Sequence, residues 1–199
     1  MMSEVVILRT GTANLASVAA AVHRAGRRTR ITDSVDDITA AERLVLPGVG
    51  AFGAVVARID AMHARAPLVE RIGAGRPTLA ICLGLQLLAA ASEESPGVDG
   101  LGVLDATVTG LPPGVRRPQL GWNRVTADPG CALLTDGDAY FANSYKLDRV
   151  PDGWRGALTD HGGAFVAAVE RGAVLACQFH PELSGSWGQA LVERWLELS

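Results

Sequence analysis

Residues 78–86 of the chain read Thr-Leu-Ala-Ile-Cys-Leu-Gly-Leu-Gln. The first four form an apolar run typical of a strand buried on both faces, and a helix-forming run follows directly. Cys82 therefore stands at a sharp strand-to-helix turn, beside the free N–H groups of the next helix, where a thiolate is favoured. Ala80 and Gly84 are small enough for such a crowded turn. The stretch predicts a nucleophilic cysteine whose neighbour Leu83 offers its N–H to an oxyanion.

The chain before this stretch alternates strand-like and helix-like segments. Short apolar runs predict buried strands at residues 5–8, 29–32, 44–46 and 78–81. Helices are expected over residues 15–22, with Thr12 or Asn14 as the cap, from Ser34 onward, and from Phe52 toward Pro77. This alternation predicts an α/β fold, with a mostly parallel sheet that is covered by helices on both faces.

The second half indicates a different arrangement. Residues 92–114 are rich in Gly, Pro and Asp, which predicts a connection made mainly of loops. Short β-like runs follow at residues 122–126, 139–141, 165–169 and 174–179, and a final helix is expected from about Ser186. We therefore expect a single α/β domain over residues 1–199, with a small antiparallel extension.

Composition excludes several classes of protein. The 199 residues are 48% hydrophobic and 20% charged, which is typical of one globular domain. A net charge of −3 argues against a nucleic-acid partner. The three cysteines, Cys82, Cys131 and Cys177, are too few and scattered for a disulfide framework, which favours a reducing compartment. Without a signal-like start or an apolar run long enough for a bilayer, the sequence predicts a cytoplasmic protein with no membrane association.

A second motif follows the apolar run at residues 174–179, which leads into His180-Pro181-Glu182. In a continued extended conformation His180 and Glu182 project from the same face, and Pro181 ends the strand because it cannot donate a ladder hydrogen bond. With Cys82 they match a nucleophile, base and orienting group. A buried structural cysteine and a polar surface histidine are the alternatives, and the occurrence of both motifs in one chain favours the triad.

Residues 48–53 read Gly-Val-Gly-Ala-Phe-Gly, a literal dinucleotide-binding pattern. Pro47 separates it from the preceding strand, and the acidic residue expected about 20 positions later, Glu70, falls in a helix-like segment. Dinucleotide binding is therefore the weaker interpretation. Residues 47–50 can instead form a flexible turn whose N–H groups face an oxyanion.

Together these motifs resemble the cysteine-dependent class I glutamine amidotransferases. The resemblance spans residues 5–196, and the segments at 11–17, 46–52, 121–123, 140–145 and 167–170 resemble the glutaminase subunits of imidazole glycerol phosphate synthases. It implies a flavodoxin-like α/β domain that hydrolyses glutamine to glutamate and ammonia without cofactor or metal. The ammonia would pass to a separate (β/α)8-barrel cyclase, which forms imidazole glycerol phosphate and aminoimidazole carboxamide ribotide in histidine biosynthesis.

The resemblance also implies roles for individual residues. Cys82 would be the nucleophile, His180 the base and acid, and Glu182 the orienting group. The N–H groups of Val49 and Leu83 would form the oxyanion hole. Glutamine would be held by Gly50, Gln86, Ser144 and Tyr145. The surface facing the cyclase would carry Asn14, Trp122, Asn123 and Tyr140.

The chain departs from the family pattern at Arg9, Thr10, Ala13, Gln119, Asn143 and Leu183. Most of these positions are expected on the partner-facing side, so a related glutaminase that supplies a different synthase stays open. Two further alternatives are a catalytically silent scaffold and a nucleotide-binding oxidoreductase. An intact triad argues against the scaffold, and a co-purifying cofactor would indicate the oxidoreductase.

Overall fold

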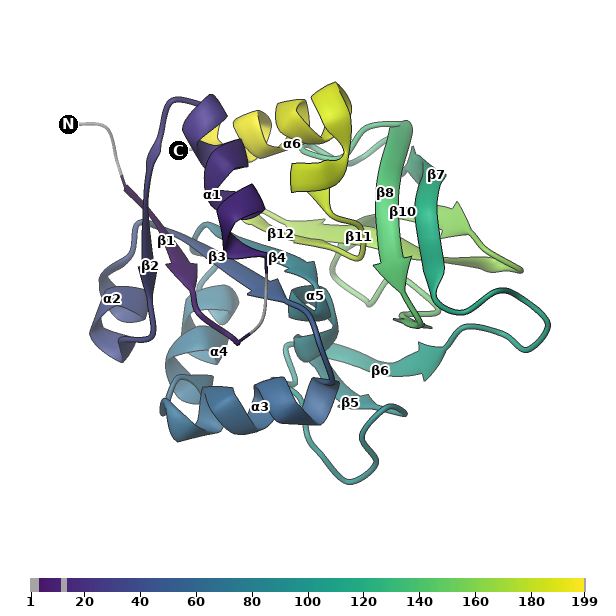
Figure 1. Cartoon of the computed structure of the whole chain (residues 1–199), viewed down its shortest axis with the longest axis horizontal. Helices are drawn as coiled ribbons and strands as arrows, with labels where there is room; N and C mark the ends of the chain where they lie inside the picture. The colour runs from purple at the N-terminus through teal and green to yellow at the C-terminus, as the bar shows by residue number, and fades with distance from the viewer. Residues whose placement is uncertain (1–3, 12–13, 199) are drawn as a thin grey trace.

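The computed structural model describes residues 4–11 and 14–198 (Figure 1). The strands in these ranges are β1 (Glu4–Leu8), β2 (Arg28–Thr32), β3 (Arg43–Gly48), β4 (Thr78–Cys82), β5 (Ala89–Ser92), β6 (Leu104–Gly110), β7 (Gln119–Ala127), β8 (Gly137–Asn143), β9 (Tyr145–Lys146), β10 (Arg155–Asp160), β11 (Ala164–Arg171) and β12 (Val174–Cys177). The helices are α1 (Leu15–Arg24), α2 (Val35–Ala40), α3 (Phe52–Ala61), α4 (Arg65–Gly73), α5 (Leu83–Leu87) and α6 (Gly185–Glu197), with a 3₁₀ turn, η1 (Pro181–Leu183).

The main sheet has nine strands in the order β2-β1-β3-β4-β12-β11-β10-β7-β8. The first five pair in parallel, and the other four continue the sheet with antiparallel pairing. Strands β5, β6 and β9 form a second, three-stranded sheet. Helices α1 and α6 cover one face of the parallel part, and α3 and α4 lie on the other (Figure 1). The predicted α/β fold is confirmed, and its antiparallel part is larger than the small extension expected.

The parallel strands are buried on both faces because successive side chains point to opposite sides of a sheet. Val5 and Ile7 of β1 belong to the core that also contains residues of α1 and α6. Val6 and Leu8 belong to the core that contains residues of α2, α3 and α4. The continuous apolar runs of the sequence follow from this two-sided burial.

Helices α1 and α2 begin with ordinary capping side chains. The side chain of Asn14 accepts a hydrogen bond from the backbone N–H of Ser17 at 3.2 Å, whereas the other candidate cap, Thr12, lies outside the described residues. Ser34 caps α2 through the N–H of Asp37. None of the helices in the described residues is long and apolar enough to cross a membrane.

Three sequence expectations about secondary structure were wrong or incomplete. The helical segment from Phe52 is two helices, because His63 adopts a left-handed conformation (φ 55°) after α3. The connection at 92–114, expected to be mainly loop, contains the seven-residue strand β6, since most of its Gly, Pro and Asp residues lie outside that strand. Strand β10 was not predicted, because a register shift between Ala157 and Leu158 breaks the apolar alternation.

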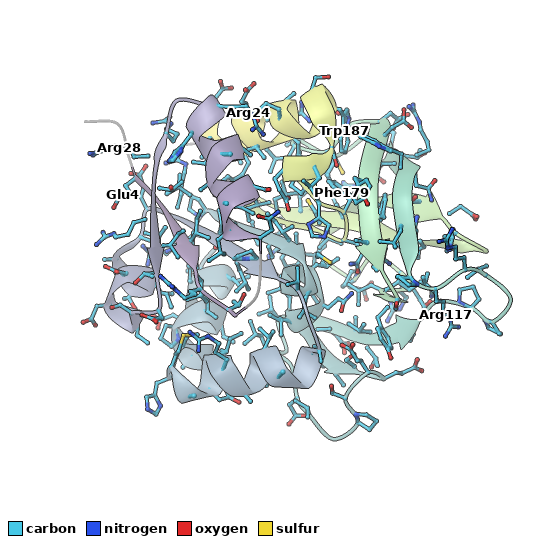
Figure 2. The ribbon with its side chains drawn as sticks, viewed as in Figure 1. Glu4, Arg24, Arg28, Arg117, Phe179 and Trp187 are labelled. Atoms are coloured by element: carbon cyan, nitrogen blue, oxygen red, sulfur yellow. The ribbon has the colours of Figure 1, made fainter. Side chains whose placement is uncertain are left out.

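An aromatic cluster anchors the segment that follows β12. Phe179 packs against Phe141 of β8 and Trp187 of α6, with ring centroids 5.7 and 5.3 Å apart (Figure 2). Phe141 in turn contacts Phe165 of β11 edge to face at 6.1 Å. His180 directly follows Phe179, so its position is set by an aromatic cluster that joins β8, β11 and α6.

The turn from β4 into α5 depends on close backbone packing. A Cβ atom on Gly84 would lie 2.1 Å from the carbonyl oxygen of Leu46 in β3. A Cβ atom on Gly48 would lie 2.8 Å from the backbone nitrogen of Gly84. Any larger side chain at these positions must push α5 away from β3.

We expect Gly84→Ala to lower the free energy of unfolding by about 1–3 kcal/mol, because the added methyl group overlaps the Leu46 carbonyl. Gly73→Ala is the matched control, since a Cβ atom there meets nothing within 4 Å and alanine favours the helix by up to about 1 kcal/mol. Urea denaturation measures both. Equal stability of the two variants would show that the close approach does not constrain the turn.

Candidate active site

Cys82 lies at the apex of the turn between β4 and α5. Its backbone has φ 54° and ψ −110°, a strained conformation for a residue with a side chain. The glycine contacts described above hold it there. Leu83, the next residue, begins α5, where N–H groups have no acceptor within the helix. The geometry matches the predicted elbow.

His180 and Glu182 form the expected pair, with His180 Nδ1 2.8 Å from Glu182 Oε1. The local structure differs from the prediction, because β12 ends at Cys177 and Glu182 lies in η1 rather than on an extended strand. Pro181 occupies the first position of this 3₁₀ turn, where its fixed φ and missing N–H are tolerated. The turn, and not strand alternation, brings the carboxylate to the imidazole.

The backbone of His180 is fixed to strand β8. Its N–H donates to the carbonyl oxygen of Tyr140 at 2.9 Å. The hydroxyl of Ser184, which is buried, donates to the His180 carbonyl at 2.6 Å and accepts from the Tyr140 N–H at 2.9 Å. These bonds set where the imidazole can lie.

The electrostatics of His180 favour its charged form. Burial lowers the pKa of His180, but hydrogen bonds and charge interactions with Cys82 and Glu182 outweigh burial and raise that pKa to about 10. Burial, with nearby carboxylates, raises the pKa of Cys131 to about 11 and that of Cys177 well above its ordinary value. Both are therefore poor nucleophiles at neutral pH.

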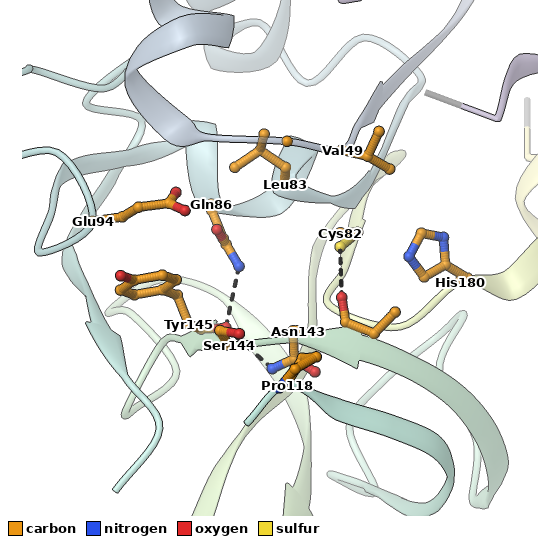
Figure 3. A pocket seen from close by; sticks show the side chains of 12 residues that line it. Val49, Cys82, Leu83, Gln86, Glu94, Pro118, Asn143, Ser144, Tyr145 and His180 are labelled. Carbon is orange, nitrogen blue, oxygen red and sulfur yellow. Dashed lines mark hydrogen bonds between the residues drawn. The ribbon is translucent and has the colours of Figure 1, made fainter. Parts of the chain in front are cut away.

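Cys82 and His180 open into a cavity of about 330 Å³ (Figure 3). This volume is near the lower end of small-molecule pockets, about 300–1,000 Å³, and suits a ligand of amino-acid size. Eight sequence-predicted residues line the cavity, namely Val49, Gly50, Cys82, Leu83, Gln86, Ser144, Tyr145 and His180. Its wall also contains Glu94, Pro118, Ala142 and Asn143, which the sequence analysis did not assign to the site.

The amide of Gln86 has a defined orientation. Its Nε2 donates to the Tyr145 carbonyl at 3.1 Å and to Gln178 Oε1 at 3.0 Å. Both donors of the amide are therefore used within the protein. Its oxygen is left to accept a hydrogen bond from a ligand.

Glu94 is the acidic residue that the sequence analysis missed. In Figure 3 it lies at the end of the cavity away from Cys82 and His180. Glu94 Oε2 accepts a hydrogen bond from the N–H of Phe52 at 2.8 Å, and Ser95 Oγ accepts one from Gly53 at 3.0 Å. The first N–H groups of α3 are thus already bonded to the chain itself, which argues against pyrophosphate binding at the glycine pattern. No sequence signal marks Glu94 within a segment read as a loop.

The residues expected to face a partner do not all share one surface. Trp122 and Tyr140 are a cross-strand pair with ring centroids 6.3 Å apart, and Trp122 is 59% exposed. Asn123, the next residue on β7, points to the other face and donates to the Asp160 carbonyl. Asn14 is exposed and, with Leu183, borders a small cavity of about 50 Å³ beside His180 and Glu182. Of the four residues expected at the partner surface, Asn123 is the one whose side chain points away from Trp122 and Tyr140.

The departures from the family pattern are also placed differently from expectation. Thr10, Gln119 and Asn143 are buried, so they do not face a partner. Arg9 and Leu183 are exposed, and Ala13 lies outside the described residues. The Thr10 hydroxyl donates to the Pro47 carbonyl at 2.6 Å, which ties the turn at 47–50 to β1. Most of the described departures thus lie inside the protein.

The described residues contain no group of three or more His, Cys, Asp or Glu side chains arranged to hold a metal ion. All three cysteines are free. The chemistry that these residues offer is nucleophilic attack by a thiolate, with proton transfer by an oriented histidine.

Comparisons with known proteins agree with this geometry. A family model described as glutamine amidotransferase class-I matches residues 9–197. Relatives named imidazole glycerol phosphate synthase subunit HisH include the Deinococcus radiodurans protein, 41% identical over 95% of this chain and 91% of the relative. The Rhodopirellula baltica protein of the same name is 44% identical over 92% of this chain and 91% of the relative.

The fold is also found among solved structures. A crystal structure described as a glutamine amidotransferase superposes with a TM-score of 0.78 at 22% identity, covering 98% of this chain and 97% of that one. The sequence relatives and this solved structure therefore point to the same family. The chain belongs to the class-I glutamine amidotransferase family and, within it, to the HisH subunits of imidazole glycerol phosphate synthase.

Proposed function

We propose that the chain hydrolyses glutamine to glutamate and ammonia, and that it supplies this ammonia to an imidazole glycerol phosphate synthase in histidine biosynthesis. The observation that carries the proposal is the convergence of Cys82 and His180 on one cavity, with Glu182 bonded behind the imidazole. Glutamine as the substrate is supported by the family model, and the synthase is supported by the names of the HisH relatives. We further propose that residues 1–199 act as one domain in the cytoplasm.

The reaction begins with attack of the Cys82 thiolate on the side-chain carbonyl carbon of glutamine. The negative charge that develops on the carbonyl oxygen is stabilised by the N–H groups of Leu83 and Val49. His180, which is protonated at neutral pH, gives its proton to the departing nitrogen, and ammonia leaves a glutamyl thioester on Cys82. Glu182 holds the imidazole ring and stabilises its charge.

The second half of the reaction needs His180 as a base. Once Cys82 is acylated its negative charge is gone, so one cause of the raised pKa of His180 disappears. The neutral imidazole then accepts a proton from water, which attacks the thioester and releases glutamate. The same histidine thus serves as acid first and as base afterwards.

The cavity provides complementary groups for the rest of glutamine. We propose that the Gln86 oxygen and the Glu94 carboxylate accept hydrogen bonds from the α-ammonium end, away from Cys82 (Figure 3). Gly50, Ser144 and Tyr145 would enclose the aliphatic part and the carboxylate.

For the partner we propose a (β/α)8-barrel cyclase that docks on the surface formed by Asn14, Trp122, Tyr140 and Leu183. Trp122 is a large aromatic side chain left mostly exposed, as expected for an anchor at a protein interface. Leu183 is 40% exposed and is one of the positions at which the chain departs from the family pattern. The second candidate function is a related glutaminase that supplies a different synthase, and this exposed apolar residue on the proposed docking surface is the observation behind it.

We expect Cys82→Ala to lower the turnover of glutamine by roughly 10⁴-fold or more, by analogy with serine triads, without unfolding the protein. No other group can form the thioester. Ammonia release from glutamine measures it, and Cys131→Ala is the control that keeps its activity. Retained turnover in Cys82→Ala would contradict the proposal.

His180 and Glu182 should differ in their effects. His180→Ala should be nearly inactive, whereas Glu182→Gln should keep measurable activity, because an amide still positions the imidazole but stabilises its cation poorly. Steady-state glutaminase assays separate the two variants. Wild-type rates in both would rule out the pair as part of the chemistry.

The isolated chain should bind glutamine but turn it over slowly if the turn at 47–50 must reorient before the Val49 N–H reaches the oxyanion. Gly50, with φ 100°, gives that turn the freedom to change. Because one oxyanion donor is worth roughly 10²–10³-fold in turnover, a ligand-bound cyclase should activate by at least about 10²-fold.

A histidine-pathway cyclase tests the identity of the partner. Complex formation and activation would support the histidine pathway, and Trp122→Ala should then weaken the complex. If neither complex nor activation appears, while Cys82-dependent glutaminase activity is present, the alternative synthase is favoured. The true partner should in that case present an apolar or neutral group to Leu183, since an acidic residue there would be buried unpaired.

A further inference from the structure

Gln178 lies two residues before His180 and is fully buried beneath the nucleophile. Its Nε2 is 3.7 Å from Cys82 Sγ, within hydrogen-bond distance for a sulfur acceptor. Its Oε1 accepts from Gln86 Nε2 at 3.0 Å, and its backbone N–H donates to the Ala167 carbonyl at 2.8 Å. The side chain therefore bridges the reacting sulfur and a residue of the ligand cavity.

The hydrogen-bond network fixes which end of the Gln178 amide faces the sulfur. Gln86 Nε2 is bonded to the Tyr145 carbonyl, which can only accept. This bond identifies the Gln86 side-chain atom nearest to Gln178 as the nitrogen, so the atom of Gln178 that accepts its hydrogen bond must be the oxygen. A flipped Gln178 would place two NH₂ groups against each other. The N–H of Gln178 consequently points at Cys82.

The sulfur has different partners in its two protonation states. As a thiol, Cys82 donates to the Ala142 carbonyl at 3.9 Å (Figure 3). As a thiolate it can only accept, and the Ala142 oxygen becomes an unfavourable neighbour. A buried anion needs donors that remain in place when the proton leaves. Gln178 is such a donor, and its position does not depend on the protonation of His180.

We propose that Gln178 is a catalytic residue whose side-chain N–H stabilises the Cys82 thiolate, with its orientation set by Gln86. The inference rests on the proposed glutaminase function and deepens it. It also links the ligand cavity to the nucleophile, because Gln86 lines the cavity and its side chain bonds Gln178. A ligand that reorients Gln86 would therefore disturb the donor to the sulfur.

Two variants separate this role from a packing role. Gln178→Met conserves approximate volume and removes the donor. Gln178→Glu keeps an acceptor for Gln86 Nε2, and in its ionised form it removes the donor and adds negative charge beside the sulfur. Gln119→Leu is the matched control, because it removes a buried amide of β7 that forms no contact with Cys82 among the hydrogen bonds described.

The measurement is the rate of Cys82 alkylation by iodoacetamide as a function of pH. Peptide mass spectrometry quantifies the alkylation of Cys82, Cys131 and Cys177 separately. We expect Gln178→Met to move the midpoint of the Cys82 curve upward by about one pH unit, a tenfold loss of reactive thiolate below the midpoint. Gln178→Glu should move it further, and Gln119→Leu should leave it in place. Circular dichroism is used to check that each variant is folded.

An unchanged midpoint in folded Gln178→Met would overturn the inference. If Gln178→Met does not fold, Gln178→Leu decides, because it also removes the donor without adding charge. The assay needs no glutamine turnover, so the two proposals fail separately. A shifted midpoint in a chain without glutaminase activity would contradict the proposed function alone. An unshifted midpoint in a chain that hydrolyses glutamine would contradict the role of Gln178 alone.

Discussion

The backbone contact between Gly84 and the Leu46 carbonyl is the constraint on which the rest of the site depends. It brings the start of α5 so close to β3 that no side chain fits between them. Cys82 is held at a positive φ by this packing, since the strained turn can persist only where neighbouring structure over-determines it. The sulfur, the Leu83 N–H and the turn at 47–50 thus meet at the carboxyl ends of two adjacent parallel strands.

The remaining groups reach this place from the other half of the sheet. Strand β12 pairs in parallel with β4, so its continuation passes beside the nucleophile. Gln178 and His180 lie in this continuation, just after the end of β12. The segment is fixed to β8 by the packing of Phe179 against Phe141 and by the hydrogen bond from the His180 N–H to the Tyr140 carbonyl. Because Tyr140 also pairs with the exposed Trp122, the backbone that holds His180 is continuous with the surface proposed for the partner.

Local signals made much of this predictable from the sequence. The apolar runs, the small residues around Cys82 and the proline after His180 each report on a structure that forms within a few residues. The second half was harder, because antiparallel pairing with a register shift at Ala157 leaves no regular apolar alternation. The roles of Glu94 and Gln178 and the side-chain direction of Asn123 are set by contacts between segments that are distant in the sequence. No short sequence pattern encodes those contacts.

The other proposed roles depend on one assignment, Cys82 as the nucleophile of a cavity that binds glutamine. It is tested most directly with a glutamine analogue that carries an electrophilic diazoketone in place of the amide, 6-diazo-5-oxonorleucine, followed by peptide mass mapping. We expect one covalent adduct per chain, on Cys82, and we expect glutamine to suppress its formation. No adduct, or an adduct on Cys131 or Cys177 that glutamine does not suppress, would contradict it.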